Sequence, residues 1–491
     1  MSEQKAKTKE GIDRLYSLIE PHSFANIKWV EEEDRLRYFV KEPDMSNEEI
    51  REMNDIKENV IEKLEIDLTD VHEDTTPREY IGEKVEEAIE ELSLGLTKES
   101  REKIFYYLKR DLAGLGKLEP LMNDPNLEEV SCDGTDAPVF VVHREYGSIK
   151  TDVWFEEMEE LNRFVSKLAQ RTGRHISAAE PMLEGSLQDG SRLQATYKSE
   201  VTRKGPTFTI RKFRENPLTP IDLIENETLD PEMLAYIWHI VERGYSMLIS
   251  GGTATGKTTM LNVSSLFIRK NDKIVSIEDT PELRLPHDNW LPAVSRPGYG
   301  PQDYGEVDLF DLVKASLRQR PDFVVPGEVR GEEAYVLFQA MATGHAGLGT
   351  IHAETVDALL NRLLTDPINL SASLLTSLDA VVFLGFANIG DQKVRKVQNM
   401  VEVTGMSSDG DVETQNVFEY ERSSNSFHFT GKSQIIQELI ENKGEDPDNL
   451  EESSVWKEIE SKTEFLKQVR ERGVDDIDEF SERLEVYRRN Q

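Results

Sequence analysis

Cysteine and long apolar runs are scarce in this sequence. Cys132 is the single cysteine among 491 residues, which excludes an intrachain disulfide and a cysteine-based zinc cluster, so we expect it to serve packing. No stretch approaches the ~18 uninterrupted apolar residues that a membrane-spanning helix needs, and the first twenty residues lack the apolar core of a signal peptide. We therefore expect a cytoplasmic protein that meets a membrane only at its surface.

Positive charge is also in short supply. The chain has 58 lysines and arginines against 94 aspartates and glutamates, a formal net charge of -36. Such a charge repels polyanions, so we expect no general nucleic-acid binding. Two explanations of the acidity remain open: a salty cytoplasm, where screening acts over ~3 Å at molar salt, or simply acidic helices and tails.

Changes of composition divide the chain into five segments. Residues 1–100 are rich in Glu and Lys and predict an acidic helical N-terminal extension, whereas residues 101–215 predict a smaller α+β N-terminal domain. Residues 216–228 contain two prolines and predict a linker. In residues 229–420 apolar strand-like runs alternate with helical segments, which predicts an α/β domain with a parallel sheet. Residues 421–491 predict an acidic helical C-terminal extension.

Two helices can be predicted in more detail. Asp230 and Pro231 suit the N-cap and first position of a helix that ends at Gly244. Its apolar face would consist of Leu234, Ile237 and Val241. A helix near the C-terminus would carry a stripe of Trp456, Ile459, Leu466 and Val469.

A strand-like run leads into GGTATGKTT and then into a helical segment, which is the setting that a P-loop requires. The glycines let backbone amides face phosphate oxygens, the helix N-terminus adds a partial positive charge, and Lys257 adds a full one. Thr258 would supply a hydroxyl to Mg²⁺. The predicted nucleotide-binding residues are Gly251, Gly252, Thr253, Ala254, Thr255, Gly256, Lys257, Thr258 and Thr259. The plain alternative is a glycine turn beside a surface lysine.

A second strand ends in the acidic cluster IEDTPE. Glu278, Asp279 and Glu282 would then lie past its carboxyl edge, where open α/β sheets bind ligands. Glu282 is our candidate for orienting or deprotonating the attacking water. The alternative is an acidic cap for the next segment.

A third strand, in PDFVVPGEVRG, places Glu328 after an apolar run. P-loop enzymes hold a carboxylate against Mg²⁺ and its waters in this way, so Glu328 is a predicted metal ligand. Pro326 is awkward in such a strand because it lacks a ladder donor, so it would sit just beyond the last paired residue. Arg330 would bridge either to a neighbouring acid or to the γ-phosphate.

Two histidines, His345 and His352, lie seven residues apart across a glycine-rich stretch. Metal ligation would need further soft ligands, which the stretch lacks. Neutral histidines that sense the γ-phosphate or bridge subunits fit better. Ordinary packing or surface histidines are the remaining alternative.

The order of GGTATGKTT, IEDTPE, LRQRPDFVVPGEVRG and TGHAGLGTIHAET resembles the type II/IV secretion ATPase superfamily, in particular its archaeal pilus and archaellum assembly members. The resemblance covers roughly residues 100 to 405 and implies a RecA-like fold for the P-loop domain. It places the Walker A motif on Gly251–Thr258, the aspartate box on Glu278–Glu282, the Walker B motif on Phe323–Glu328 and the histidine box on His345–His352.

The resemblance also implies roles for arginines of the N-terminal domain. In relatives such arginines reach the nucleotide across a domain or subunit junction, and the candidates by similarity are Arg192, Arg211 and Arg214. Structural ion pairing is the alternative for each.

Family members are hexameric rings in which ATP hydrolysis moves N-terminal domains against RecA-like domains and pushes on an integral-membrane platform protein. The resemblance therefore implies a Mg²⁺-dependent ATPase that binds ATP, acts as a homo-hexamer at the cytoplasmic face of the membrane and powers assembly of a type IV pilus-like filament or secretion. An archaellum motor, a DNA or protein secretion ATPase, and a regulator that binds nucleotide without hydrolysing it remain alternatives.

Overall fold

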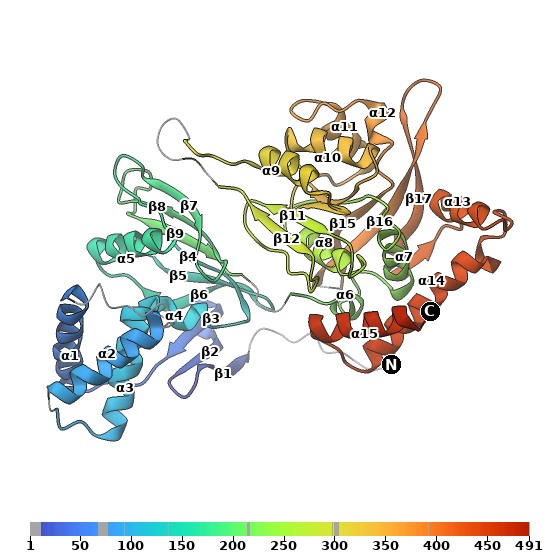
Figure 1. Ribbon diagram of the computed structural model, residues 1–491. Helices are drawn as coiled ribbons and strands as arrows, with labels where there is room; N and C mark the ends of the chain where they lie inside the picture. The colour runs from blue at the N-terminus through green and yellow to red at the C-terminus, as the bar shows by residue number, and fades with distance from the viewer. Residues whose placement is uncertain are drawn as a thin grey trace. The chain divides into compact units, whose positions relative to one another are not determined.

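The computed structural model describes residues 11–66, 77–92, 94–135, 137–213, 217–296, 298, 304–390 and 392–490. The chain forms two compact units, 1–214 and 215–491 (Figure 1). In the described residues each unit has its own nine-stranded sheet. The mixed α/β fold class predicted from the sequence is thereby confirmed.

The sheet of the first unit is mainly antiparallel. Its strand order is β1-β2-β3-β6-β5-β4-β9-β8-β7, and β3 pairs with β6 in parallel. The strands are β1 (Asp13–Ile19), β2 (Ser23–Val30), β3 (Arg35–Lys41), β4 (Leu127–Cys132), β5 (Pro138–His143), β6 (Gly147–Trp154), β7 (Met182–Ser186), β8 (Arg192–Thr196) and β9 (Thr207–Arg211). The helices are α1 (Asn47–Ile66), α2 (Pro77–Glu91), α3 (Lys98–Leu108), α4 (Glu119–Met122) and α5 (Met158–Arg171).

The prediction that residues 1–100 are helical is wrong for their first part, because β1, β2 and β3 extend the sheet of the first unit. These strands bury alternate residues: Ala25 and Ile27 on β2, Leu36 and Tyr38 on β3. The period of two is the strand signal, and charged residues between the apolar positions conceal it.

Helices α1, α2 and α3 form a small core of their own from Ile56, Val60, Val85, Ala88, Ile89, Ile104 and Leu108. The helical prediction therefore holds for the described part of residues 47–91. Cys132 is fully buried in the core under the sheet, in agreement with a packing role.

The sheet of the second unit joins a parallel half to an antiparallel half. Its order is β12-β11-β13-β14-β10-β15-β16-β17-β18; neighbours from β12 to β15 are parallel, and those from β15 onward are antiparallel. The strands are β10 (Met247–Gly251), β11 (Ile274–Glu278), β12 (Trp290–Val294), β13 (Phe323–Pro326), β14 (Ala346–Ile351), β15 (Ala380–Ile389), β16 (Gln392–Met406), β17 (Val412–Glu421) and β18 (Ser426–Phe429). The helices are α6 (Pro220–Glu225), α7 (Pro231–Val241), α8 (Lys257–Ser265), α9 (Leu309–Ser316), α10 (Glu333–Ala342), α11 (Val356–Leu364), α12 (Ala372–Leu375), α13 (Gln434–Asn442), α14 (Ser454–Glu471) and α15 (Ile477–Arg489).

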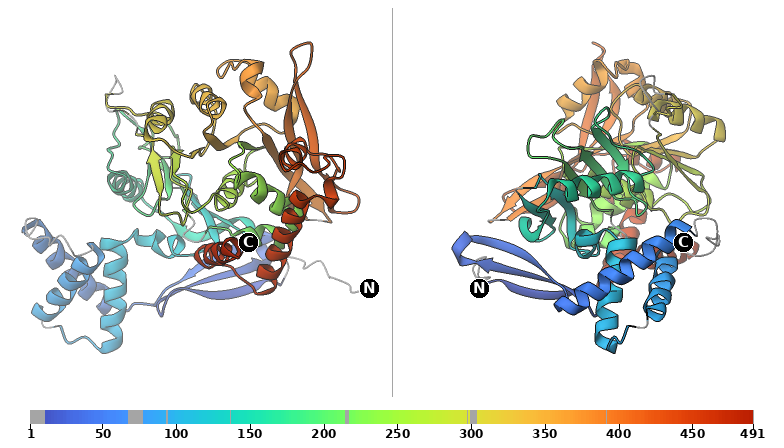
Figure 2. Two further views of the ribbon diagram at one scale, coloured as in Figure 1. Left: turned by 45° about the vertical axis from the view of Figure 1, so that its right-hand side comes forward. Right: turned by 90° about the vertical axis from the view of Figure 1, so that its left-hand side faces the viewer.

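Both faces of this sheet are covered. Met247 and Ile249 on β10 face the core with α7, α8 and α13–α15, whereas Leu248 between them faces the core with α9–α12. Figure 2 shows the red C-terminal helices and the yellow and orange α9–α12 on different sides of the strands. The central strands β10, β11, β13 and β14 are therefore buried at every residue and mostly apolar, as parallel strands with two covered faces require.

Pro326 is the last residue of β13 and pairs in register with Ile277 of β11. It thus lies in the strand, rather than just beyond it as predicted. Its missing N–H does not interrupt the ladder, because the next residue, Gly327, donates its N–H to the carbonyl oxygen of Ile277 at 2.8 Å.

The predicted helix after the linker is confirmed as α7, capped by Asp230, whose Oδ1 accepts the Met233 N–H at 2.8 Å. The helix is buried on all sides from Met233 to Val241 because α14 covers the face turned away from the sheet. The linker itself is not structureless: Thr219 and Asp222 form a capping box that begins α6.

The C-terminal segment packs as part of the second unit. The predicted stripe of Trp456, Ile459, Leu466 and Val469 is buried in its core. The prediction that 421–491 is purely helical is wrong at its start, because residues 426–429 form the edge strand β18. Within the described ranges no helix has the length and apolar character to cross a bilayer.

Candidate functional site

The predicted P-loop connects the end of β10 to the start of α8. Gly256 has φ 97°, a left-handed conformation that glycine adopts at low cost, and it caps the helix that Lys257 begins. A Cβ on Gly251 would lie 2.5 Å from the carbonyl oxygen of Leu384 on β15, so only glycine fits there. The loop therefore presents the free N–H groups of a helix N-terminus at the carboxyl edge of the parallel strands.

Lys257, a buried residue, bends back onto its own loop. Its Nζ donates to the carbonyl oxygen of Gly252 at 2.8 Å and lies 3.4 Å from Nδ1 of His352. Burial lowers the pKa of Lys257, although the carboxylate of Glu328 acts in the opposite direction. The ammonium group is thus held at the phosphate end of the loop by uncharged partners that an anion can displace.

His352 stands between this lysine and a carboxylate. Its Nε2 lies 3.5 Å from Oε1 of Glu328. Burial, and next the charge of Lys257, lower the pKa of His352, so the ring is neutral near pH 7. A neutral ring that accepts from Lys257 at Nδ1 carries its proton on Nε2, facing Glu328.

The acidic cluster after β11 divides into a buried and a more exposed carboxylate. Glu278 is 4% exposed, and its Oε1 accepts the N–H groups of Glu282 at 2.9 Å and Leu283 at 3.1 Å. Burial raises the pKa of Glu278 to about 7 despite these hydrogen bonds. Glu278 therefore positions the turn that carries Glu282, whose side chain is half-buried. The sequence indicated the cluster but not this division of roles.

Arg330 lies against a neighbouring acid. Its guanidinium donates to Asp279, which also accepts the hydroxyl of Ser295 at 2.8 Å. The backbone N–H groups of Arg330 and Gly331 both donate to Oε1 of Glu333, at 2.6 and 2.8 Å. These bonds tie the segment after β13 to the segment after β11.

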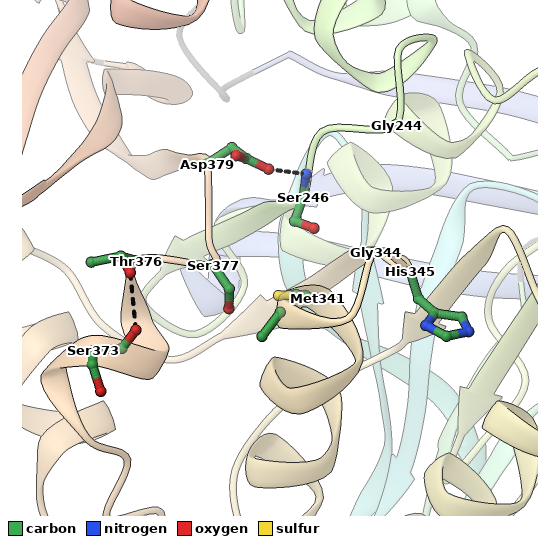
Figure 3. Close-up of a pocket in the computed structure, with 10 residues that line it drawn as sticks. Gly244, Ser246, Met341, Gly344, His345, Ser373, Thr376, Ser377 and Asp379 are labelled. Atoms are coloured by element: carbon green, nitrogen blue, oxygen red, sulfur yellow. Dashed lines mark hydrogen bonds between the residues drawn. The ribbon is translucent and has the colours of Figure 1, made fainter.

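The structure does not bring the two histidines together. His345 precedes β14 and His352 follows it, so a strand of six residues, about 20 Å long, separates them. His345 lines a polar pocket at the amino edge of the sheet with Ser246 and Asp379 (Figure 3). Within one chain it cannot sense a γ-phosphate at the P-loop, and its bridging of subunits stays a prediction.

Two of the three predicted arginines lie side by side in the first unit. Arg192 on β8 and Arg211 on β9 are opposite each other in the antiparallel register, and both are exposed. Glu129 on β4 is the next residue across from Arg211. Arg214 lies outside the described residues.

Sequence reasoning missed one P-loop contact. Arg395 on β16 donates its Nε to the carbonyl oxygen of Ala254 at 2.9 Å. The two residues are 141 positions apart, and no motif connects them. A pairing of strands, which the sequence does not display, brings Arg395 to the loop.

The residues present fit a nucleotide and its metal. The described part of the chain has no cluster of three histidine, cysteine or acidic side chains able to hold a metal by itself. Mg²⁺ at such sites uses one or two protein oxygens together with phosphates and waters, which Thr258 in the first turn of α8 and Glu328 after β13 can supply. The loop glycines leave room for phosphate, and Lys257 supplies charge.

Comparison with known proteins identifies the family. The chain belongs to the type II/IV secretion system protein family, whose model matches residues 111–486. An uncharacterized protein of Methanocaldococcus jannaschii is 39% identical over 386 residues, which are 78% of this chain and 69% of that protein. A putative conjugal transfer protein of Mycobacterium tuberculosis is 32% identical over 253 residues, 50% of this chain and 71% of its own length. Among solved structures, the Legionella pneumophila ATPase DotB is similar over 72% of this chain and 86% of its own, with 16% identity and a TM-score of 0.41.

Proposed function

We propose that this chain is a Mg²⁺-dependent ATPase that powers assembly of a type IV pilus-like filament or secretion through a membrane platform. The observation that carries the proposal is the grouping of Lys257, His352 and Glu328 at the start of the P-loop helix. Three neighbouring strands in the parallel half of the sheet, β10, β14 and β13, deliver these residues to the carboxyl edge of that half. Family membership supports the same class of activity.

Each residue has a role that its surroundings support. Lys257 and the helix N-terminus neutralise phosphate charge, and Thr258 and Glu328 hold Mg²⁺ with its waters. Glu282, on a turn held by Glu278, orients the attacking water. His352 keeps Lys257 and Glu328 apart as a neutral hydrogen-bonding group.

The proposal extends to a ring of six copies. Arg192 and Arg211 would complete the nucleotide site, as the resemblance implies, and arginine contacts of this kind contribute roughly 10³–10⁵ in rate. Assembly would then control hydrolysis. The partner would be an integral-membrane platform protein, and the ring would stand at the cytoplasmic face of the membrane.

The test is ATP turnover of the purified full chain over a range of protein concentrations, at low and at molar salt. Lys257→Ala and Glu282→Gln serve as variants, and binding of a fluorescent ADP analogue is measured in parallel. We expect turnover per chain to rise with assembly and to vanish in both variants. We also expect Glu282→Gln to keep its affinity for nucleotide, because Glu282 acts on water.

Nucleotide binding without turnover under every condition would overturn the proposal and favour a nucleotide-dependent regulator. Turnover that is independent of protein concentration would support the ATPase activity but refute the control of hydrolysis by assembly.

A further inference from the structure

Arg395 on β16 is hydrogen-bonded to the backbone of the P-loop, although it lies far from the loop in the sequence. The Nε of Arg395 donates to the carbonyl oxygen of Ala254, which has a left-handed φ of 60°. The Cδ of Arg395 lies 3.6 Å from where a Cβ on Gly256 would be, so the side chain covers the start of α8. Among the described residues, the two terminal nitrogens of Arg395 have no hydrogen-bond partner.

The next two residues of β16 hold a different segment. Lys396 is 1% exposed, and its Nζ lies 3.2 Å from Oε2 of Glu227. Val397 donates its N–H to the carbonyl oxygen of Thr228 at 2.8 Å. Glu227 and Thr228 form the turn between α6 and α7, in the segment through which the chain enters the second unit.

A peptide group links the Arg395 contact to phosphate binding. Across a planar trans peptide the C=O and the following N–H point in opposite directions. An arginine that holds the Ala254 carbonyl oxygen therefore turns the N–H of Thr255 to the side away from itself. The donor direction of one loop amide thus depends on a side chain from β16.

We propose that Arg395 is a positioning residue for nucleotide binding at the P-loop and that β16 couples this binding to the turn at Glu227 and Thr228. The inference rests on the proposed function, because it requires a nucleotide at the P-loop. Bound phosphate draws the Thr255 N–H and releases Lys257 from its loop carbonyl. The Ala254 carbonyl belongs to the same peptide group as the Thr255 N–H and shifts with it. This shift moves the side chain of Arg395, which is hydrogen-bonded to that carbonyl.

The strand is suited to transmit that shift. Arg395, Lys396 and Val397 all pair with β15, whereas β17 pairs with β16 only from Asn399 onward, so this part of β16 belongs to the sheet through β15. Lys396 is enclosed by the rings of Tyr420 and Phe427, each with its centroid 5.7 Å from Nζ. A displacement of β16 therefore changes both bonds to the turn.

The test uses the full chain with Mg²⁺ and a fluorescent ADP analogue, together with amide hydrogen exchange of peptides that cover residues 220–230 and 392–400. We expect Arg395→Ala to weaken binding about tenfold, as the loss of a charge-assisted hydrogen bond does. Arg395→Lys, whose ammonium can still donate to Ala254, should restore most of the affinity. In the wild type nucleotide should change exchange at Thr228 and Val397, and in Arg395→Ala this change should disappear.

Two further variants separate nucleotide binding at the P-loop from the response of the turn at Glu227 and Thr228. Lys396→Met should bind nucleotide within about twofold of the wild type and show a smaller exchange response of the turn, since the tie to Glu227 is gone and only the bond from the Val397 N–H to the Thr228 carbonyl remains. Lys393→Met is the matched control: Lys393 lies two residues before Arg395 on the same strand face, with its ammonium 4.0 Å from the ring centroid of Phe386. It should match the wild type in both measurements.

The outcomes distinguish a failure of this inference from a failure of the proposed function on which it rests. A wild type that binds no nucleotide overturns both. A wild type that binds, with Arg395→Ala equal to it in affinity and exchange, overturns the inference alone. Equal losses in Lys393→Met and Arg395→Ala would show an effect of net charge and would also refute it; melting temperatures confirm that each variant is folded.

Discussion

At the residue scale, the site depends on carboxylates that occupy unlike surroundings. Glu278 ends an entirely buried strand, while Glu282 lies four residues later on a turn at the sheet edge. Burial favours the protonated form of Glu278, and its hydrogen bonds to two backbone N–H groups only partly offset this. One acid of the cluster therefore serves structure, and the other is available for chemistry.

The raised pKa of Glu278 predicts a pH-dependent stability. Since the folded-state pKa, about 7, exceeds the ordinary glutamate pKa of 4.5, the contribution of Glu278 to stability is fully present below pH 4.5 and is lost as pH rises through 7. Glu278→Gln keeps an acceptor oxygen for both N–H groups and removes this loss. We expect the variant to gain on the order of 3 kcal/mol of unfolding free energy over the wild type between pH 5 and 8.

Urea unfolding at several pH values measures the difference, with Glu332→Gln, at an exposed position, as control. Parallel pH curves for Glu278→Gln and the wild type would show that Glu278 keeps an ordinary pKa.

Replacing each of the two histidines should affect ATP turnover to a different degree. His352→Ala removes the group between Lys257 and Glu328, so we expect turnover at saturating ATP to fall about tenfold, the effect of one lost hydrogen bond to a charged group. His345→Ala acts at the other edge of the sheet and should change turnover per assembled chain less than about twofold. Steady-state kinetics, measured with the same fraction of each variant assembled, tests both expectations. A larger effect of His345→Ala would indicate that His345 bridges subunits.

At the element scale, the C-terminal helices secure the P-loop helix at its far end. Arg488 on α15 donates to the carbonyl oxygens of Phe267, at 2.7 Å, and Ile268, at 3.3 Å, just after α8 ends. The same guanidinium donates to Glu242 at 2.7 Å, and Lys462 of α14 donates to the other oxygen of Glu242 at 2.6 Å. α7, α8, α14 and α15 are thus joined by half-buried charges as well as by apolar packing.

Arg488→Ala should lower the free energy of unfolding by about 2–3 kcal/mol, because the half-buried carbonyl of Phe267 and one oxygen of Glu242 lose their donor, whereas the carbonyl of Ile268 keeps the ring of His287 at 3.0 Å. The adjacent exposed Arg489, changed to Ala, is the matched control and should have little effect. Chemical denaturation gives both values. Equal stabilities would mean that the apolar packing of α15 suffices.

At the scale of the whole molecule, the net charge of -36 dominates the electrostatics. Raising the salt concentration from 0.1 to 1 M shortens the screening length from about 10 to about 3 Å and relieves self-repulsion. We expect the melting temperature to rise over this range of NaCl. An uncharged solute at equal concentration is the control, and a melting temperature that falls with NaCl would show that attractive ion pairs outweigh the repulsion.

The sequence by itself determined the P-loop, the carboxylates after the next two strands and the helix capped by Asp230. These features depend on neighbours within a few residues, so local pattern and turn chemistry suffice to predict them. Prediction from the sequence failed at β1–β3 and β18, because strands with charged or polar residues between their apolar positions gain their stability from partners in the sheet.

Only the tertiary structure decided which predicted residues meet. The direction of β14 assigns His352 to the P-loop and His345 to the opposite edge, although both lie in one motif. Strand pairing brings Arg395 to Ala254, and burial separates Glu278 from Glu282. Register and burial are set by the packing of distant segments, and such long-range contacts leave no local trace in the chain.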